Sequence, residues 1–209
     1  MKKNRNIIQN LEKNYRKYRW FFTSTGKLVI GGKSAEQNDL LLREIKESGR
    51  NFVIMHTSNP GSPFCVILTD LERATEQDQR ECAIFTACFS KAWKEARKEA
   101  GVDIFSSSQL LKDKKMKQGT WGALGKVEKI TVSLELALTK QKNILKAVPE
   151  SSVKDKKNIL VKIQPGNIPK EGMLKKLESV FGRRLNKEEL LSALPSGGFK
   201  IYEKKNAES

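Results

Sequence analysis

The chain has 209 residues, 38% of them hydrophobic, and its 40 Lys and Arg against 24 Asp and Glu give a formal net charge of +16. A chain of this length can bury a core without disulfides or metals, and no apolar run approaches the roughly 20 residues of a membrane span. The charge favours a polyanionic partner, nucleic acid first, over an acidic membrane or protein surface or a purely solubilising role. The three cysteines lie in apolar segments, as buried thiols of a reducing compartment do, so we expect a cytoplasmic protein.

The N-terminal part of the chain predicts a helix, a hairpin and a second helix. Apolar residues spaced three and four apart over residues 6–18, with Lys and Arg between them, predict a basic amphipathic helix. Two apolar runs, residues 20–22 and 27–30, flank a short glycine-containing connection and predict a β-hairpin. A capping box that begins at Ser34 predicts a helix that stops at Gly49.

The middle of the chain predicts strands around the longest helix. Residues 52–55 and 64–68 are apolar runs joined by a tight Pro- and Gly-containing loop, which predicts strand, loop, strand. A cap signal at Thr75 precedes an apolar stripe from Cys82 to Ala96, which predicts one long helix.

The rest of the chain predicts more strands and a small C-terminal unit. Residues 102–105 predict a strand, and strict alternation over residues 130–138 predicts one half-buried strand. We expect a first domain over residues 1–148, a linker over 149–157, and a small βααβ unit over 158–209. The fold class is therefore α+β, with a mixed, largely antiparallel sheet packed against two main helices.

The candidates for catalysis are few. His56 is the only histidine, which excludes every multi-histidine metal site, and the chain has no C-x-x-C pair for zinc. Ser62, His56 and Asp70 could form a hydrolytic triad, but the G-x-S-x-G turn is absent. We therefore expect no metal, no cofactor and no catalytic residues, with His56 at a strand end or against a base or phosphate.

One glycine-rich stretch, residues 119–126, contains Trp121 and follows a run of lysines. Its glycines are spaced wrongly for a Walker A loop, and an isolated GXXG at residues 122–125 is a weak match to the backbone clamp of KH domains. Trp121 can be either a core residue or a platform on which bases stack. The preceding lysines could supply phosphate contacts beside it.

Four segments of the chain carry further short motifs, in this order: Trp20-Phe21-Phe22-Thr23-Ser24 with Gly26, Leu28-Val29-Ile30-Gly31-Gly32-Lys33, Ala35 and Gln37-Asn38-Asp39-Leu40-Leu41; His56 with Pro60-Gly61-Ser62-Pro63; Ala87 with Ser90-Lys91-Ala92-Trp93; and Gly119-Thr120-Trp121 with Gly125-Lys126. In this order the segments resemble the NFACT-R domain, the RNA-binding region of NFACT ribosome quality control factors. The resemblance covers about Tyr15 to Leu138.

The resemblance implies a non-catalytic RNA-binding adaptor in translation or ribosome-associated quality control. Its expected partners are ribosomal or transfer RNA and the large ribosomal subunit, with no membrane. The chain departs from the family at Leu124, where arginine is usual, so the resemblance implies no basic contact at this position. Full-length factors add a domain resembling DNA glycosylases, a helix-hairpin-helix segment and a coiled coil. None fits in this chain, which resembles a stand-alone archaeal NFACT-R protein, so synthesis of protein tails is not implied.

We expect the RNA contacts at basic and loop residues of the first domain. These are Arg16, Arg19, Lys33, His56, Gly61, Ser62, Lys91, Lys112, Lys114, Lys115, Lys117, Trp121, Gly125 and Lys126. Two other functions stay open: an RNA-processing or RNA-modification factor that uses His56, and a protein-interaction scaffold that uses the C-terminal unit.

Overall fold

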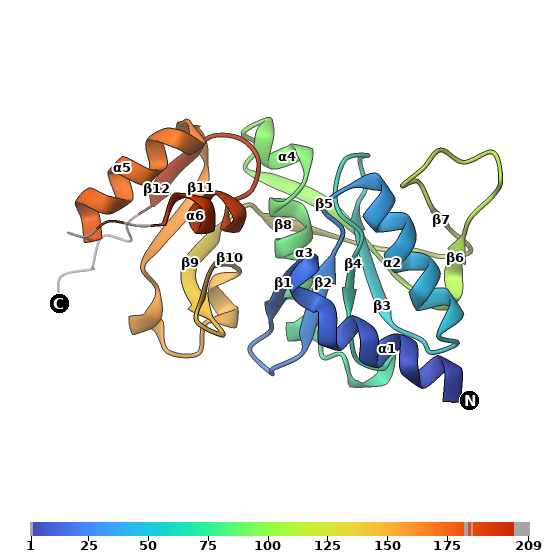
Figure 1. The fold of residues 1–209 in the computed structure, drawn as a ribbon. Coiled ribbons are helices and arrows are strands. Elements are labelled where there is room, and N and C mark those ends of the chain that lie inside the picture. The colour runs from blue at the N-terminus through green and yellow to red at the C-terminus, as the bar shows by residue number, and fades with distance from the viewer. Residues whose placement is uncertain (1, 182–183, 185, 203–209) are drawn as a thin grey trace.

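The computed structural model describes residues 2–181, 184 and 186–202, which form two lobes, each built on its own sheet (Figure 1). The larger lobe holds a six-stranded sheet in the order β1 (Arg19–Phe22), β2 (Leu28–Gly31), β4 (Cys65–Ile67), β3 (Val53–Thr57), β5 (Glu99–Ser106), β8 (Glu128–Ser133). The smaller lobe holds a four-stranded sheet in the order β10 (Ile144–Val148), β9 (Leu136–Gln141), β11 (Val161–Ile168), β12 (Phe199–Tyr202). Neighbouring strands in both sheets are antiparallel, and the α+β class is confirmed.

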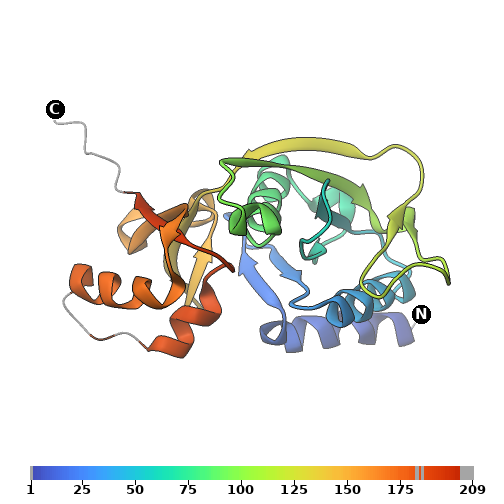
Figure 2. The ribbon, with the colours of Figure 1, turned by 90° about the horizontal axis from the view of Figure 1, so that it is seen from above.

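Helices cover both faces of the six-stranded sheet. Helices α1 (Lys2–Asn14) and α2 (Ala35–Glu47) lie side by side on one face (Figure 2), and α3 (Glu76–Cys88) packs on the other. Along β2, Ile30 packs into the cluster with α2, and its neighbour Val29 packs into the cluster with α3. Because successive side chains of a strand point to opposite faces, a sheet covered on both sides needs unbroken apolar runs.

The predicted hairpin and the predicted helix after it are confirmed. Strand β1 pairs with β2, and Trp20 lies opposite Ile30. Helix α2 starts where the capping box placed it, with the Ser34 hydroxyl accepting a hydrogen bond from the backbone N–H of Gln37. The three cysteines are buried free thiols, as their apolar segments indicated.

The single long helix predicted up to residue 96 is wrong, because the chain breaks it at Ser90. Helix α3 ends at Cys88, and a short helix α4 (Lys91–Lys94) follows. The Ser90 hydroxyl donates to the carbonyl of Ala87 at 2.7 Å and accepts from the N–H of Ala92 at 3.1 Å, so it closes one helix and caps the next. The short helix ends in turn where Ala96 adopts a positive φ of 54°.

The single strand predicted over residues 130–138 is also wrong. It is two strands, β8 ending at Ser133 and β9 starting at Leu136, and they belong to different sheets. At the crossing, the N–H of Leu134 donates to the carbonyl of Lys98 at 2.9 Å. The four-stranded sheet therefore includes β9 and β10, which precede the expected linker at residues 149–157.

The C-terminal elements follow the expected order of strand, helix, helix, strand. They are β11, α5 (Lys170–Phe181), α6 (Lys187–Ala193) and β12. Asn186 caps α6 by accepting a hydrogen bond from the N–H of Glu189 at 2.9 Å. Residues 203–209 of the expected unit lie outside the described part of the chain.

One tryptophan, Trp93, and one glutamine, Gln141, connect the two lobes. Trp93 of α4 is fully buried among side chains of the smaller lobe, with its ring 5.6 Å from that of Phe199 and its Nε1–H donating to the carbonyl of Gly198 at 3.1 Å. The side-chain amide of Gln141 bonds both the N–H and the carbonyl of Phe22, at 2.8 and 2.9 Å. The edge strand β1 of the larger sheet is thereby tied to the smaller sheet.

Candidate nucleic-acid interface

The hairpin brings two of the predicted contact residues together. Arg19 opens β1 and pairs with Gly31, so Lys33, two residues further on, lies at the same end of the hairpin. Arg19 is partly buried, with its guanidinium carbon 4.8 Å from the centre of the Phe89 ring, and Lys33 is exposed. Arg16 is exposed on a turn of 3-10 helix before β1, with its guanidinium carbon 5.9 Å from the ring centre of Tyr15.

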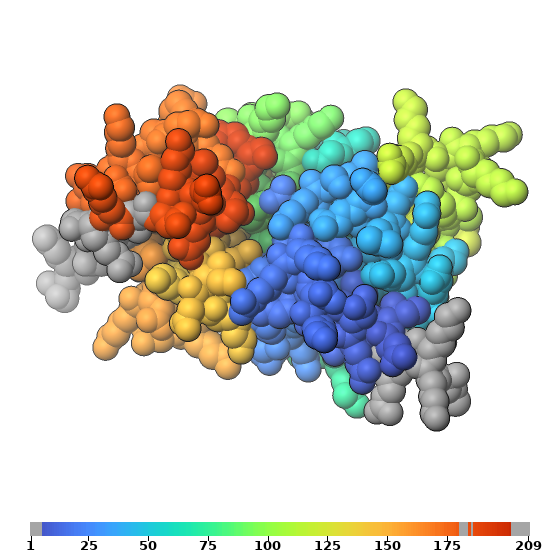
Figure 3. All heavy atoms as spheres, in the orientation of Figure 1, coloured from blue at the N-terminus to red at the C-terminus, as the bar shows by residue number. Residues whose placement is uncertain are grey.

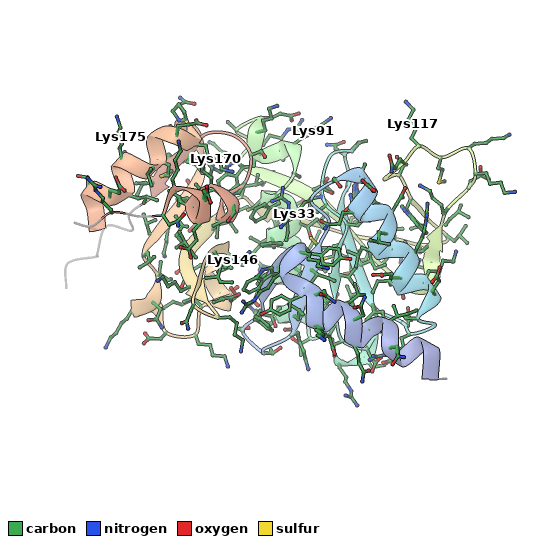
Figure 4. The ribbon with its side chains drawn as sticks, in the orientation of Figure 1. Lys33, Lys91, Lys117, Lys146, Lys170 and Lys175 are labelled. Carbon is green, nitrogen blue, oxygen red and sulfur yellow. The ribbon has the colours of Figure 1, made fainter. Side chains whose placement is uncertain are left out.

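Two lysines of the smaller lobe complete this group of cations, which we call the seam cluster: Arg19, Lys33, Lys146 and Lys170. Lys146 lies on β10 with its ammonium nitrogen 4.4 Å from the ring centre of Trp20, and Lys170 opens α5. Figure 4 shows Lys33, Lys146 and Lys170 near the line where the two lobes meet. Sequence reasoning missed both lysines of the smaller lobe. The one signal was a lysine set inside the apolar run of residues 144–148.

The electrostatics of the seam cluster are those of like charges held close together. Burial first, and then the charges of Lys33 and Arg19, lower the pKa of Lys146 to about 7. Burial and the charge of Arg19 also lower the pKa of Lys33 and of Lys170, although Glu171 acts on Lys170 in the opposite direction. No ion pair in the described part of the chain includes a member of the cluster. Such a group favours an anion between its members.

In the proline-containing loop after β3, the predicted contact residue Gly61 lies against Lys91, another predicted contact residue. Gly61 has a φ of +108°, and a Cβ there would lie 2.5 Å from the side chain of Lys91, so only glycine lets the lysine stem pass. The backbone N–H of Lys91 donates to the carbonyl of Gly61 at 2.9 Å. Lys91 itself is exposed, and its charge lies beside the loop.

The hydrolytic triad considered from the sequence is not assembled. The Ser62 hydroxyl accepts from the N–H of Thr57, and Asp70 is paired with Arg50 at 2.7 Å. His56 donates from Nδ1 to the carbonyl of Thr57 at 2.7 Å and stacks on Phe64 at 4.3 Å, and its burial lowers its pKa. Among the described residues there is also no group of three or more His, Cys, Asp and Glu side chains that could hold a metal.

The lysine-rich loop projects from a two-stranded ribbon, β6 (Leu110–Leu111) and β7 (Gly122–Ala123). Lys114, Lys115 and Lys117 are exposed on it, and the loop stands out at the upper right of Figure 3. Lys112 differs, because its ammonium group donates to Asp39 and to the carbonyls of Lys117 and Thr120, all within 3.0 Å. Lys112 therefore holds the loop closed. Gly125 and Lys126 are exposed after β7.

Trp121 is packed into the larger lobe and is only 9% exposed. Its Nε1–H donates to Asp39 at 2.7 Å, and the ammonium nitrogen of Lys112 lies 5.4 Å from its ring centre. Burial acts to raise the pKa of Asp39, but hydrogen bonds from Gly119, Lys112 and Trp121 outweigh it and leave that pKa lowered. The contacts favour the core interpretation of Trp121, because little of the ring remains for a base to stack on.

None of the helices in the described part of the chain is long and apolar enough to cross a membrane.

Comparison with curated proteins finds the archaeal Rqc2 homolog aRqcH of Methanocaldococcus jannaschii, 26% identical over 94% of this chain and 30% of that protein. The ribosome quality control complex subunit NEMF of mouse and of human is 30% identical over 41% of this chain and 8% of that protein. The chain thus spans less than a third of the length of these relatives.

A solved structure, the C-terminal part of the fibronectin/fibrinogen-binding protein of Streptococcus suis, aligns with a TM-score of 0.47 and 22% identity over 56% of this chain and 44% of that one. That likeness is too distant to bear on the site. The family model for the NFACT protein RNA binding domain matches residues 17–125, from the turn before β1 to the glycine-rich loop. This match covers half of the chain, so the chain belongs to the family of NFACT RNA-binding domains.

Proposed function

We propose that the protein is a cytoplasmic RNA-binding adaptor in ribosome-associated quality control, which binds ribosomal or transfer RNA through its basic surface and catalyses no reaction. The observation that carries this proposal is the seam cluster, four cations gathered from both lobes without a carboxylate paired to any of them among the described residues. A polyanion offsets such a group, and the family's description names RNA. The proposed role in ribosome quality control is based on the names of the relatives.

The basic surface extends well beyond the seam cluster. Lys175 and Lys170 on one lobe and Lys91 and Lys117 on the other lie across the whole width of the molecule (Figure 4). A surface of this kind favours contacts to the RNA backbone, which position the chain without reading its sequence. We propose that residues 1–148 carry most of these contacts and that residues 158–209, joined through 149–157, add to them.

RNA affinity is expected to fall steeply with salt. If the protein neutralises about six phosphates of a single-stranded RNA, the logarithm of the binding constant falls against the logarithm of salt concentration with a slope of roughly −4. Reversing Lys114, Lys115 and Lys117 to Glu is expected to weaken every RNA about equally and to bring the slope to roughly −2. A salt titration by fluorescence anisotropy with unrelated RNA sequences measures both effects.

The matched control reverses Lys140, Lys154 and Lys157, three exposed lysines outside the lysine-rich loop, to Glu. It changes the net charge by the same amount, so a contribution from overall charge appears equally in both variants. Lys112 is left intact because its ammonium group holds the loop. Binding that does not change between low and high salt contradicts the proposal.

Association with ribosomes is expected to be salt-sensitive as well. The protein is expected to co-sediment with large ribosomal subunits in sucrose gradients of lysate at low salt, because the contacts proposed are ionic. Nuclease treatment is expected to release it. Protein that stays in the top fractions even when translation is stalled contradicts the ribosomal role and favours a free RNA as ligand.

A further inference from the structure

The seam cluster is placed by packing on aromatic rings. Lys146 lies 4.4 Å from the ring centre of Trp20, which is only 3% exposed, and Arg19 lies 4.8 Å from that of Phe89. The ring faces attract cations but do not neutralise them. The structure therefore fixes the positions of two positive charges and leaves the charges themselves uncompensated.

The charges of Lys33 and Arg19 act on Lys146, and the charge of Arg19 also acts on Lys33 and on Lys170, so Arg19 is the member that the three lysines share. The ammonium group of Lys170 also donates to the carbonyl of Leu194 at 3.2 Å. Of the nearby acids, Glu189 of α6 accepts a hydrogen bond from the N–H of Leu145 at 2.7 Å, and Glu171 lies beside Lys170 and offsets part of its charge. A bound anion offsets the mutual repulsion of Arg19, Lys33 and Lys146 and favours the charged form of Lys146.

We propose that the seam cluster binds one phosphate group of an RNA backbone, held by both lobes together, with Arg19 at its centre and Lys146 as a ligand from the smaller lobe. This inference rests on the proposed function and specifies the ligand of one site. Arginine offers a phosphate two parallel N–H donors, and lysine ammonium groups act as point charges around it, so Arg19 with the three lysines forms a suitable set of ligands. The site needs the smaller lobe, because Lys146 and Lys170 both belong to it.

Binding at this site is coupled to a proton. In the free protein Lys146 has a pKa of about 7, and a phosphate beside it favours the charged form and raises that pKa. At pH 6 the ammonium group is already protonated, and binding takes up no proton. Above pH 7 the free protein has lost the proton, so binding must recover it, and affinity falls by up to tenfold per pH unit.

The test measures binding of the full chain to a 5′-labelled oligouridine of twelve nucleotides by fluorescence anisotropy, from pH 6 to pH 8.5 at constant ionic strength. Wild-type affinity is expected to fall about tenfold between pH 7 and pH 8.5. Lys146→Arg is expected to keep the affinity of pH 6 over the whole range, because a guanidinium stays charged. Lys146→Gln is expected to bind about tenfold more weakly at pH 6 and to show little pH dependence.

The matched control is Lys140→Gln on the neighbouring strand β9, an exposed lysine whose loss is expected to leave the pH profile unchanged. Chemical denaturation of each variant verifies that it folds. RNA binding that persists in Lys146→Gln with the wild-type pH profile overturns the seam site and leaves the proposed function standing. Absence of RNA binding by the wild-type chain at low salt overturns both. Binding of polyglutamate but not of RNA, with the same pH profile, assigns the seam to an acidic protein and overturns the phosphate site.

Discussion

Replacing Trp121 by Ala is expected to lower the free energy of unfolding by about 3–5 kcal/mol. The ring is buried between the loop and α2, and its Nε1–H donates to Asp39, which also accepts from Lys112. Removing it leaves a cavity and takes one of the donors from a buried carboxylate. Urea denaturation followed by circular dichroism measures the loss.

Two variants separate the parts of this effect. Trp121→Phe keeps an aromatic ring but removes the donor, so a smaller loss of about 1–3 kcal/mol is expected. Asp39→Asn removes the charge that both Trp121 and Lys112 bind, and the loop that carries Lys114, Lys115 and Lys117 is expected to become more susceptible to proteolysis. The core interpretation is contradicted if the Trp121→Ala protein keeps wild-type stability but loses about 1–3 kcal/mol of RNA affinity. In that case Trp121 is a stacking platform.

Replacing Trp93 by Ala is expected to cost about 3–5 kcal/mol of unfolding free energy and to weaken RNA binding as well. Trp93 extends from α4 of the larger lobe into the core of the smaller lobe, beside Phe199. Its loss loosens the attachment of the smaller lobe, and with it the placement of Lys146 and Lys170. Denaturation and anisotropy on the same preparation measure the two effects.

Phe52→Ala is the control for this second prediction. Phe52 is also fully buried, but it packs in the cluster that α1 and α2 cover, and the cation over its ring is Arg50, which is not a member of the seam cluster. It is expected to cost a similar free energy of unfolding while folded protein keeps its RNA affinity. Equal affinity in folded Trp93→Ala and wild-type protein shows that the seam does not depend on this anchor.

The local elements were predictable because their signals are short-range. The hairpin of β1 and β2 and the caps at Ser34, Thr75 and Asn186 depend on residues within a few positions of each other. The family could be recognised for a similar reason, because its motifs are short blocks of sequence within the matched residues 17–125. The hairpin also places Arg19 and Lys33 at one end, since a hairpin brings together residues that are close in the chain.

Only the tertiary structure decided where the chain passes from one sheet to the other and which cations meet. Alternation of apolar and polar residues is the same in β8 and in β9, so the pattern cannot mark the change of sheet between Ser133 and Leu136. The sequence could not show that Trp121 is a buried hydrogen-bond donor, because its acceptor, Asp39, is far away in sequence. The seam cluster depends on the packing of Lys146 against Trp20 across the two lobes. Charge composition is a property of the sequence, whereas the juxtaposition of charges depends on long-range packing, and this is why the sequence by itself determined a basic RNA-binding family but not the site.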